Sequence, residues 1–169
     1  MNSKRVDKKI LFRCGDYLSS QHLKLVCAES MSAGFLSSIW ALEVSSGDYF
    51  LGSIVCYDER IKERLLQVPS NLIEKYTAES TEVTLAMLQG LEGLVPQADV
   101  YISLTGLSFP SPNPKQNRPA GRVYYAFSYK ENRKIFEKQI KGRNAGEIII
   151  GTCNSILKDL YNWLNGLNT

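Results

Sequence analysis

The stretch Leu23-Lys24-Leu25-Val26-Cys27-Ala28-Glu29-Ser30-Met31-Ser32-Ala33-Gly34 decides the fold of this chain. Its first half, Leu23–Ala28, is a short apolar run, which is typical of a strand buried on both faces. A helical pattern follows over residues 35–44, so the small and polar residues in between predict a strand-to-helix turn. Ligands of open α/β sheets bind outside the carboxyl ends of the strands, which makes Ser30 a candidate site residue.

Helices and strands alternate on both sides of this stretch. Apolar spacing predicts helices over residues 8–21, 35–44, 58–67, 72–76, 81–95 (with Thr81 as N-cap) and 149–164. Short apolar or alternating runs predict strands over 23–28, 51–57, 100–104 (half-buried), 122–129 and 134–140, with a turn at 45–48. Four of the six prolines fall in 108–120, which predicts a long loop. The order predicts an α/β fold, a three-layer α/β/α sandwich with a mixed β-sheet.

The composition excludes several classes of protein. The 169 residues predict a single domain over 1–169, with ordinary globular proportions of 44% hydrophobic and 22% charged residues. A net charge of +3 gives no basic footprint for nucleic acid, and no apolar run approaches the ~18 residues of a membrane span. The amino-terminal residues lack the apolar centre of a signal peptide. Four scattered cysteines and one histidine favour buried thiols in a cytoplasmic protein, with no disulfide and no metal site.

The turn after the first strand is the first candidate for chemistry. A helix that begins just beyond Ser30 offers free N–H groups and the positive end of its dipole to an anion. Small residues at Ala33 and Gly34 let a ligand approach the backbone. The alternative is structural, because Ser30 or Ser32 can simply cap the helix.

Tyr57 and Lys62 form the second candidate, at the end of the second strand and on the helix after it. A lysine held against the apolar seam would have a lowered pKa and could deprotonate a serine where no histidine is available. The alternative is an exposed Asp58–Lys62 pair at i,i+4 spacing, which contributes only a few tenths of a kcal/mol.

Two further positions complete the set of candidates. Thr105 and Gly106 end the third strand, so they emerge at the same sheet edge as Ser30 if the two strands are parallel. Arg143 precedes the last helix and could hold an anion there, although a lone arginine is more often solvated.

These segments resemble, in order and at compatible spacing, the motifs of the CinA C-terminal domain family, whose stand-alone members are nicotinamide-nucleotide amidohydrolases. The family's Ala-Glu-Ser-Cys-Thr-Gly-Gly, Tyr-Ser-Asn-x-x-Lys, Ala-Val-Ser-Glu-Glu-Val, Thr-Gly-Ile-Ala-Gly-Pro and Lys-Pro-x-Gly-x-Val are similar to residues 28–34, 57–62, 78–83, 105–110 and 118–123 of this chain. The resemblance covers roughly residues 8–165.

The resemblance implies a reaction and roles for the candidates. The reaction is hydrolysis of the carboxamide of nicotinamide mononucleotide to nicotinate mononucleotide and ammonia. Ser30 and Lys62 correspond to the proposed catalytic pair, with Tyr57 beside them, and backbone N–H groups of residues 31–34 would hold the oxyanion. No cofactor is implied, and a homodimer is. The substrate-binding residues expected beside them are Glu29, Ser32, Ala33, Gly34, Thr105, Gly106 and Arg143.

The chain departs from the family pattern at three places. Cys-Thr-Gly-Gly is Met31-Ser32-Ala33-Gly34 here, which adds a methyl group where the backbone could require positive φ. The substrate loop has lost two glycines and an aspartate and gained prolines. The family's second arginine is replaced by Glu147, four residues after Arg143.

These departures keep two alternatives open. One is a catalytically altered or inactive member that binds a nucleotide-like ligand or a protein partner. The other is a serine–lysine hydrolase with a changed substrate.

Overall fold

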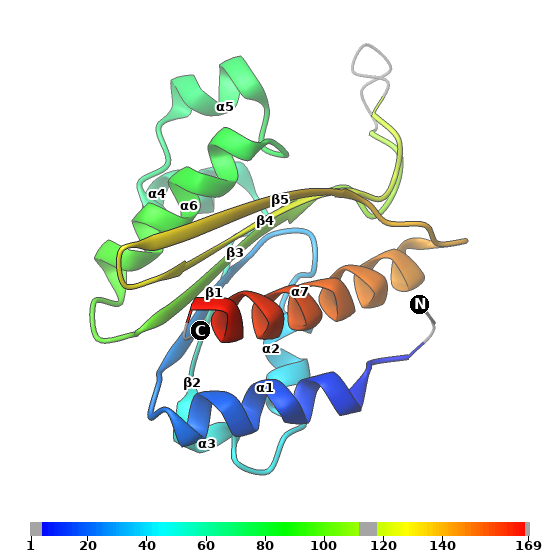
Figure 1. Ribbon diagram of the computed structural model, residues 1–169. Helices are drawn as coiled ribbons and strands as arrows, with labels where there is room; N and C mark the ends of the chain where they lie inside the picture. Colours follow the sequence, from blue (N-terminus) through cyan, green and yellow to red (C-terminus); the bar gives the residue numbers. More distant parts are fainter. Residues whose placement is uncertain (1–4, 112–117, 168–169) are drawn as a thin grey trace.

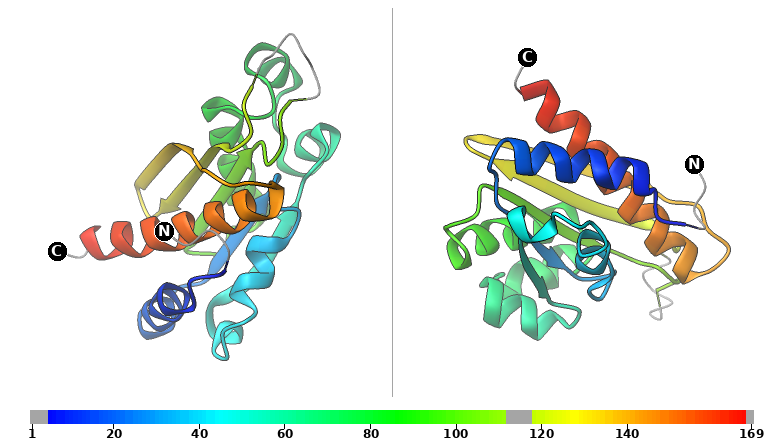
Figure 2. Two further views of the ribbon diagram at one scale, coloured as in Figure 1. Left: turned by 90° about the vertical axis from the view of Figure 1, so that its right-hand side faces the viewer. Right: turned by 90° about the horizontal axis from the view of Figure 1, so that it is seen from below.

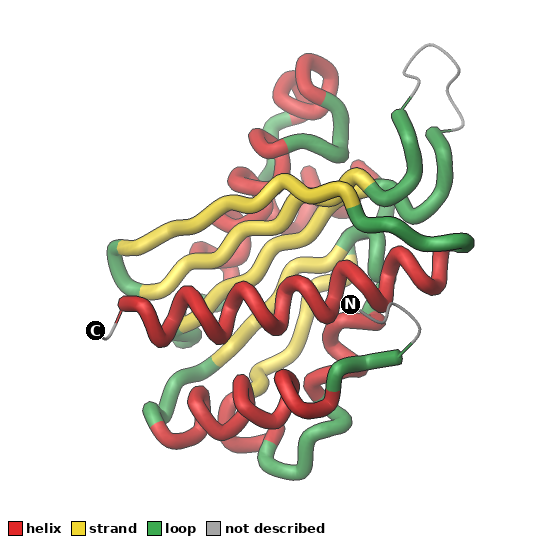
Figure 3. Tube along the Cα trace, turned by 45° about the vertical axis from the view of Figure 1, so that its right-hand side comes forward, coloured by secondary structure: helices red, strands yellow, loops and turns green. Residues whose placement is uncertain are grey.

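The computed structural model describes residues 5–111 and 118–167, and these contain a five-stranded mixed sheet. The strand order is β2-β1-β3-β4-β5, and β1 runs parallel to both β2 and β3 whereas the other neighbours are antiparallel. Figure 3 shows the five strands side by side, with helices in front of and behind them. The strands are β1 (Leu25–Glu29), β2 (Phe50–Val55), β3 (Val100–Gly106), β4 (Arg122–Tyr129) and β5 (Asn132–Gln139).

Helices cover both faces of this sheet and complete the predicted three-layer α/β/α sandwich (Figure 1). One layer contains α1 (Lys8–Ser20), α2 (Phe35–Trp40), α3 (Ser46–Tyr49) and α7 (Ala145–Leu167). The other contains α4 (Glu59–Leu66), α5 (Ser70–Tyr76) and α6 (Thr81–Leu94).

Each face of the sheet has its own apolar core. Alternate side chains of β1 separate the two, because Leu25 and Cys27 pack against α1 and α7 whereas Val26 and Ala28 pack against α6. An aromatic cluster strengthens the first core, where the rings of Phe127 and Trp163 lie 5.7 Å apart. All four cysteines are buried and unbridged, as predicted.

Several predicted boundaries need correction. The strand predicted from Leu23 begins at Leu25, and the helix predicted over 35–44 ends at Trp40. A four-residue helix, α3, occupies part of the predicted turn at 45–48. The N-cap of α6 is Ser80 and not Thr81, since the Ser80 side chain accepts a hydrogen bond from the Val83 N–H.

The burial predicted for the third strand was wrong as well. All seven residues of β3 are buried, because it lies in the middle of the sheet with a helical layer on each face. The polar Ser103 is tolerated there because its hydroxyl donates to the carbonyl oxygen of Thr84 over 2.8 Å.

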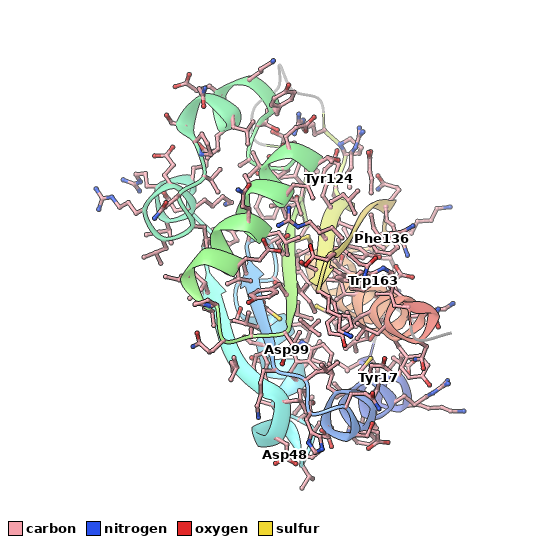
Figure 4. All side chains as sticks on the ribbon, turned by 60° about the vertical axis from the view of Figure 1, so that its left-hand side comes forward. Tyr17, Asp48, Asp99, Tyr124, Phe136 and Trp163 are labelled. Atoms are coloured by element: carbon pink, nitrogen blue, oxygen red, sulfur yellow. The ribbon has the colours of Figure 1, made fainter. Side chains whose placement is uncertain are left out.

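The carboxyl ends of β1, β2 and β3 meet at one edge of the sheet, since the three strands are parallel. The opposite, amino-terminal edge carries Asp48 and Asp99, which Figure 4 labels there. The predicted loop 108–120 leaves from the carboxyl edge, and its residues 112–117 lie outside the described residues. Its two described ends are joined by a hydrogen bond from the Ser111 N–H to the carbonyl oxygen of Arg118.

Candidate active site at the carboxyl edge of the sheet

Glu29, the last residue of β1, organises the turn that follows. Its carboxylate is fully buried and accepts four hydrogen bonds of 2.7 to 3.0 Å. The donors are the hydroxyls of Ser32 and Ser53 and the N–H groups of Leu36 and Ser37. Glu29 and Ser32, two of the residues expected to bind substrate, are therefore placed to hold the turn between β1, α2 and β2.

Ser30 lies directly at the end of β1 and is 7% exposed. Its N–H donates to the carbonyl oxygen of Leu104 at the end of β3, over 3.0 Å. This hydrogen bond fixes the Ser30 backbone between two strand ends. The side chain is thus presented at the carboxyl edge, where the sequence predicted it.

The turn after Ser30 has a left-handed backbone at two consecutive residues. Ala33 has φ of 49° and Gly34 has φ of 95°. The Ala33 N–H donates to the carbonyl oxygen of Ser30, so it is not free to hold an oxyanion. The N–H groups of Met31, Ser32 and Gly34 make no hydrogen bond within the described residues, which leaves these three as candidate donors.

Lys62 is buried at the same edge, with only 1% of its surface exposed. Its Nζ donates to the carbonyl oxygens of Cys56 and Tyr57, over 2.9 and 3.1 Å. Asp58 instead binds Arg60 and caps α4, so the alternative of an exposed Asp58–Lys62 pair is wrong.

Ser30 and Lys62 are connected through one residue, Cys56. The Cys56 N–H donates to the carbonyl oxygen of Glu29, the neighbour of Ser30, over 2.8 Å, and the Cys56 carbonyl accepts from Lys62. No hydrogen bond joins Ser30 Oγ to Lys62 Nζ within the described ranges 5–111 and 118–167.

The surroundings of Lys62 alter its affinity for a proton. Burial lowers the pKa of the Lys62 ammonium, because the charged form is separated from water. Cys56 in its thiolate form and the carboxylates of Glu79, Glu59 and Asp58 oppose this and favour the charged form. Burial also raises the pKa of the Cys56 thiol to about 11, so this thiol is neutral near pH 7.

The remaining edge residues take different positions. The Tyr57 side chain is mostly exposed beside the backbone carbonyl that Lys62 uses. Thr105 is fully buried, and its hydroxyl lies 2.8 Å from that of Thr84. Gly106 has φ of 147°, and a Cβ there would lie 2.8 Å from the backbone carbonyl oxygen of Arg122 on β4, so this position requires glycine.

Arg143 lies just before α7 and is already paired. Its guanidinium binds Glu147 at i,i+4 spacing, over 2.6 Å, and the Arg143 side chain is 72% exposed. Arg143 is therefore not brought into contact with Ser30 or Lys62. Glu147, which stands where the family pattern has a second arginine, is thus the residue that binds Arg143.

A hollow of about 470 Å³ adjoins the turn on the side of α7. It is lined by residues 32–35 and 38 and, across from them, by Gly146, Ile149 and Ile150. Its volume is within the range of small-ligand pockets, and its apolar wall comes from the first turns of α7.

Two residues of the edge, Glu79 and Arg118, had no assigned role in the sequence. Nη1 of Arg118 lies 3.8 Å from the Glu79 carboxylate and donates to the Glu79 carbonyl oxygen over 2.9 Å. The two are 39 positions apart, and neither follows a predicted strand, so no local pattern could have paired them.

The described part of the chain contains no cluster of three or more histidine, cysteine, aspartate or glutamate side chains placed to hold a metal ion. It contains no helix with the length and apolar character needed to cross a membrane.

Comparison with known proteins identifies the family of this chain. The family model described as the CinA C-terminal domain matches residues 7–164. A CinA-like protein of Fusobacterium nucleatum is 34% identical over 125 residues, which are 74% of this chain and 30% of the relative. A CinA-like protein of Synechococcus sp. is 32% identical over 134 residues, which are 79% of this chain and 32% of the relative. The chain thus spans about a third of the length of these curated relatives.

Solved structures show the same fold. The crystal structure of a competence or damage-inducible protein from Enterobacter asburiae superposes with a TM-score of 0.87 at 21% identity, covering 95% of this chain and 99% of that one. A CinA superfamily protein from Escherichia coli gives a TM-score of 0.83 at 23% identity, covering 93% and 92%. With the family model matching nearly the whole described chain, the protein belongs to the CinA C-terminal domain family.

Proposed function

We propose that the protein hydrolyses the carboxamide of nicotinamide mononucleotide to nicotinate mononucleotide and ammonia, with Ser30 as nucleophile and Lys62 as base. The observation that carries this proposal is the burial of Lys62 at the strand edge where Ser30 emerges. A buried amine with a lowered pKa is the group that a serine needs as a base where no histidine is near.

The first half of the reaction forms an acyl-enzyme. Neutral Lys62 gives up one of its hydrogen bonds to a backbone carbonyl, and its Nζ accepts the proton of the Ser30 hydroxyl. At the same time Ser30 Oγ bonds to the amide carbon. The N–H groups of Met31, Ser32 and Gly34 are the candidate donors for the oxyanion. The C–N bond then breaks as Lys62 returns the proton to the leaving nitrogen, which departs as ammonia.

The second half releases the product. Water attacks the ester carbon that Ser30 now carries, with Lys62 as the base again, and the ester C–O bond breaks. Nicotinate mononucleotide leaves and Ser30 regains its proton. The hollow between the turn and α7 is lined by Ser32, Ala33 and Gly34 of that turn and is large enough to hold part of the substrate.

A second candidate function is supported by specific contacts. Lys62 Nζ is occupied by two backbone carbonyls, and Glu147 neutralises Arg143, the cation expected to bind phosphate. The carbonyl contacts of Lys62 favour an altered or inactive family member that binds a nucleotide-like ligand or a protein partner without this hydrolysis, and the pairing of Arg143 favours a ligand or substrate other than nicotinamide mononucleotide.

The deciding experiment measures ammonia release from nicotinamide mononucleotide by the purified protein, by Ser30→Ala and by Lys62→Ala. We expect turnover in the wild type and a loss of at least about 10³-fold in both variants. Ser155→Ala is a matched control, because Ser155 is a similarly buried serine on α7, with 8% exposed. Absence of turnover in folded wild-type protein, with thermal stabilisation by the nucleotide, would reject hydrolysis and support the binding function.

Self-association is part of the same proposal. β2 is an edge strand that exposes the apolar side chains of Leu51 and Val55, and unpaired apolar edges favour pairing with another chain. Sedimentation equilibrium is expected to give the mass of a dimer, and a monomer at every concentration tested would reject this part.

A further inference from the structure

A hollow of about 480 Å³ lies between α1 and α7, which run side by side (Figure 1). Its lining residues are Asp7, Lys9, Ile10, Arg13, Lys158 and Asn162, and none of them belongs to the candidate active site. Three of these six side chains are cations and one is a carboxylate. A concave surface dominated by one sign of charge concentrates ligands of the opposite sign, so the hollow favours an anion.

Helical spacing brings the three cations together. Lys9 and Arg13 are four residues apart on α1, so they project from the same face of that helix. Lys158 lies across from them on α7, one turn before Asn162. Like charges four residues apart destabilise a helix unless an anion offsets them. Within residues 5–111 and 118–167, none of the three cations takes part in an ion pair.

The carboxylate that lines the hollow, Asp7, is engaged at the start of α1. Its side chain caps the helix by accepting a hydrogen bond from the Ile10 N–H over 3.2 Å. The Asp7 N–H donates over 2.9 Å to the side-chain oxygen of Asn154 on α7, a residue that is 1% exposed. The start of α1 is thereby fixed to α7, and the fold itself sets the spacing of the two walls.

Arg13 is held in place by an aromatic ring. Its guanidinium carbon lies 4.3 Å from the centre of the Tyr161 ring, and Nη2 donates to the Tyr161 hydroxyl over 3.0 Å. The Arg13 side chain makes no other hydrogen bond to the described residues, so most of its N–H donors are available to a ligand. A guanidinium fixed in this way suits phosphate oxygens, which it binds through two parallel hydrogen bonds.

We propose that this hollow binds a small ligand containing a diphosphate group, with Lys9, Arg13 and Lys158 as its cationic contacts. Three cations match a diphosphate, which carries more than one negative charge, and the volume is within the range of small-ligand pockets. The cations surround a concavity between two helices, which suits a compact ligand better than the extended backbone of a nucleic acid. Inorganic diphosphate and a nucleoside diphosphate share this chemistry. The inference does not depend on the proposed hydrolysis, since no residue of the hollow takes part in it.

The test measures the binding of inorganic diphosphate and of ADP by isothermal titration calorimetry at low ionic strength. We expect one site per chain, with an affinity that falls by at least about 10-fold in Arg13→Gln and about 5-fold in Lys158→Gln, because charge-assisted hydrogen bonds are lost. Arg64→Gln and Lys75→Gln are the matched controls, since they remove the same charges from exposed positions on α4 and α5. Each control is expected to change the affinity by less than about 2-fold.

The two ligands and a conservative variant sharpen the result. Tighter binding of ADP than of inorganic diphosphate would show that the nucleoside also contacts the hollow, and equal affinities would show that the diphosphate alone is recognised. Arg13→Lys keeps the charge and should retain part of the affinity that Arg13→Gln loses. Thermal unfolding of each variant checks that it is folded.

A second readout locates the ligand. In protein labelled with ¹⁵N-arginine, the Nε resonance of Arg13, assigned by its absence in Arg13→Gln, should shift when diphosphate is added, whereas that of Arg64 should not. Three results would overturn the inference: no binding at millimolar diphosphate, equal losses of affinity in Arg13→Gln and Arg64→Gln, or tighter binding of duplex DNA than of either diphosphate through the same residues.

Discussion

Lys62 donates from Nζ to the carbonyl oxygen of Cys56 over 2.9 Å, and the Cys56 N–H in turn donates to the residue before Ser30. The backbone of one residue, Cys56, thus connects the buried amine of α4 to the end of β1. Because the amine is held by backbone carbonyls and not by a carboxylate in contact, its charge is solvated only in part.

The stability of the fold should depend on the charge of Lys62. The pKa of folded Lys62 is lowered below its ordinary value of 10.5, so the unfolded chain binds more protons in the interval between the two values. The free energy of unfolding therefore rises with pH across this interval. We expect the free energy of unfolding of the wild type to rise relative to that of Lys62→Met as the pH increases from 7 to 10, measured by urea denaturation. A difference that is constant, or that moves the other way, would contradict this assignment; Lys75→Met, on exposed α5, is the control.

The carboxylate of Glu29 should be essential to the turn. Each carboxylate oxygen of Glu29 accepts two hydrogen bonds. In Glu29→Gln the NH₂ group replaces one of these oxygens, so in either orientation of the amide a donor faces two donors. We expect a loss of about 2–4 kcal/mol in the free energy of unfolding by urea denaturation. Glu74→Gln, an exposed change on α5, should stay within about 0.5 kcal/mol, and an equally small effect at Glu29 would refute the role given to it.

Ala33 is predicted to carry backbone strain. Its φ of 49° is left-handed, where a Cβ costs about 1 kcal/mol. Ala33→Gly should therefore raise the free energy of unfolding by about 0.5 kcal/mol after the greater entropy of the unfolded glycine is subtracted. Ala41→Gly is the matched control and should destabilise, because Ala41 has a right-handed φ of −68°. Equal effects of the two substitutions in thermal unfolding would rule out the strain.

The two glycines of α6 should respond in opposite directions. A Cβ at Gly90 would lie 1.9 Å from the carbonyl oxygen of Leu66, at the end of α4, whereas nothing lies within 4 Å of one at Gly93. Gly90→Ala should destabilise by about 3 kcal/mol or more, because backbone must move. Gly93→Ala should stabilise by about 0.5–1 kcal/mol through helix propensity. The order of the two midpoints in urea denaturation checks the α4–α6 packing, and a reversed order would exclude it.

The sequence carried most of the information on the fold. The apolar run before Ser30 and the strands after it predict a mixed sheet between two helical layers, and the structure confirms that architecture. Figure 2 shows both layers from two further directions. Burial of β3 was underestimated because alternation of polar and apolar residues does not reveal a polar side chain, such as Ser103, that finds a partner on a helix.

The candidate site was less accessible from sequence. The i,i+4 spacing of Asp58 and Lys62 is compatible with an exposed ion pair and with a buried amine, and only packing decides between them. Glu79 and Arg118 contact each other only in the tertiary structure, and a contact between two such distant positions leaves no periodic signal in the sequence. At Ala33, by contrast, the glycine of the family pattern pointed to a bare backbone or to a positive φ, and the structure shows the positive φ.

The four hydrogen bonds to Glu29 have a consequence for recognition. The bond from Ser32 ties the turn of residues 30–34 to β1, and the other three join α2 and β2 to the same carboxylate, so the turn is held in place before any ligand arrives. A ligand that uses the N–H groups of the turn immobilises little further backbone, because that loss of entropy occurs during folding. Association at this turn should therefore resemble docking onto a rigid template, with its selectivity determined by shape more than by adaptation of the chain.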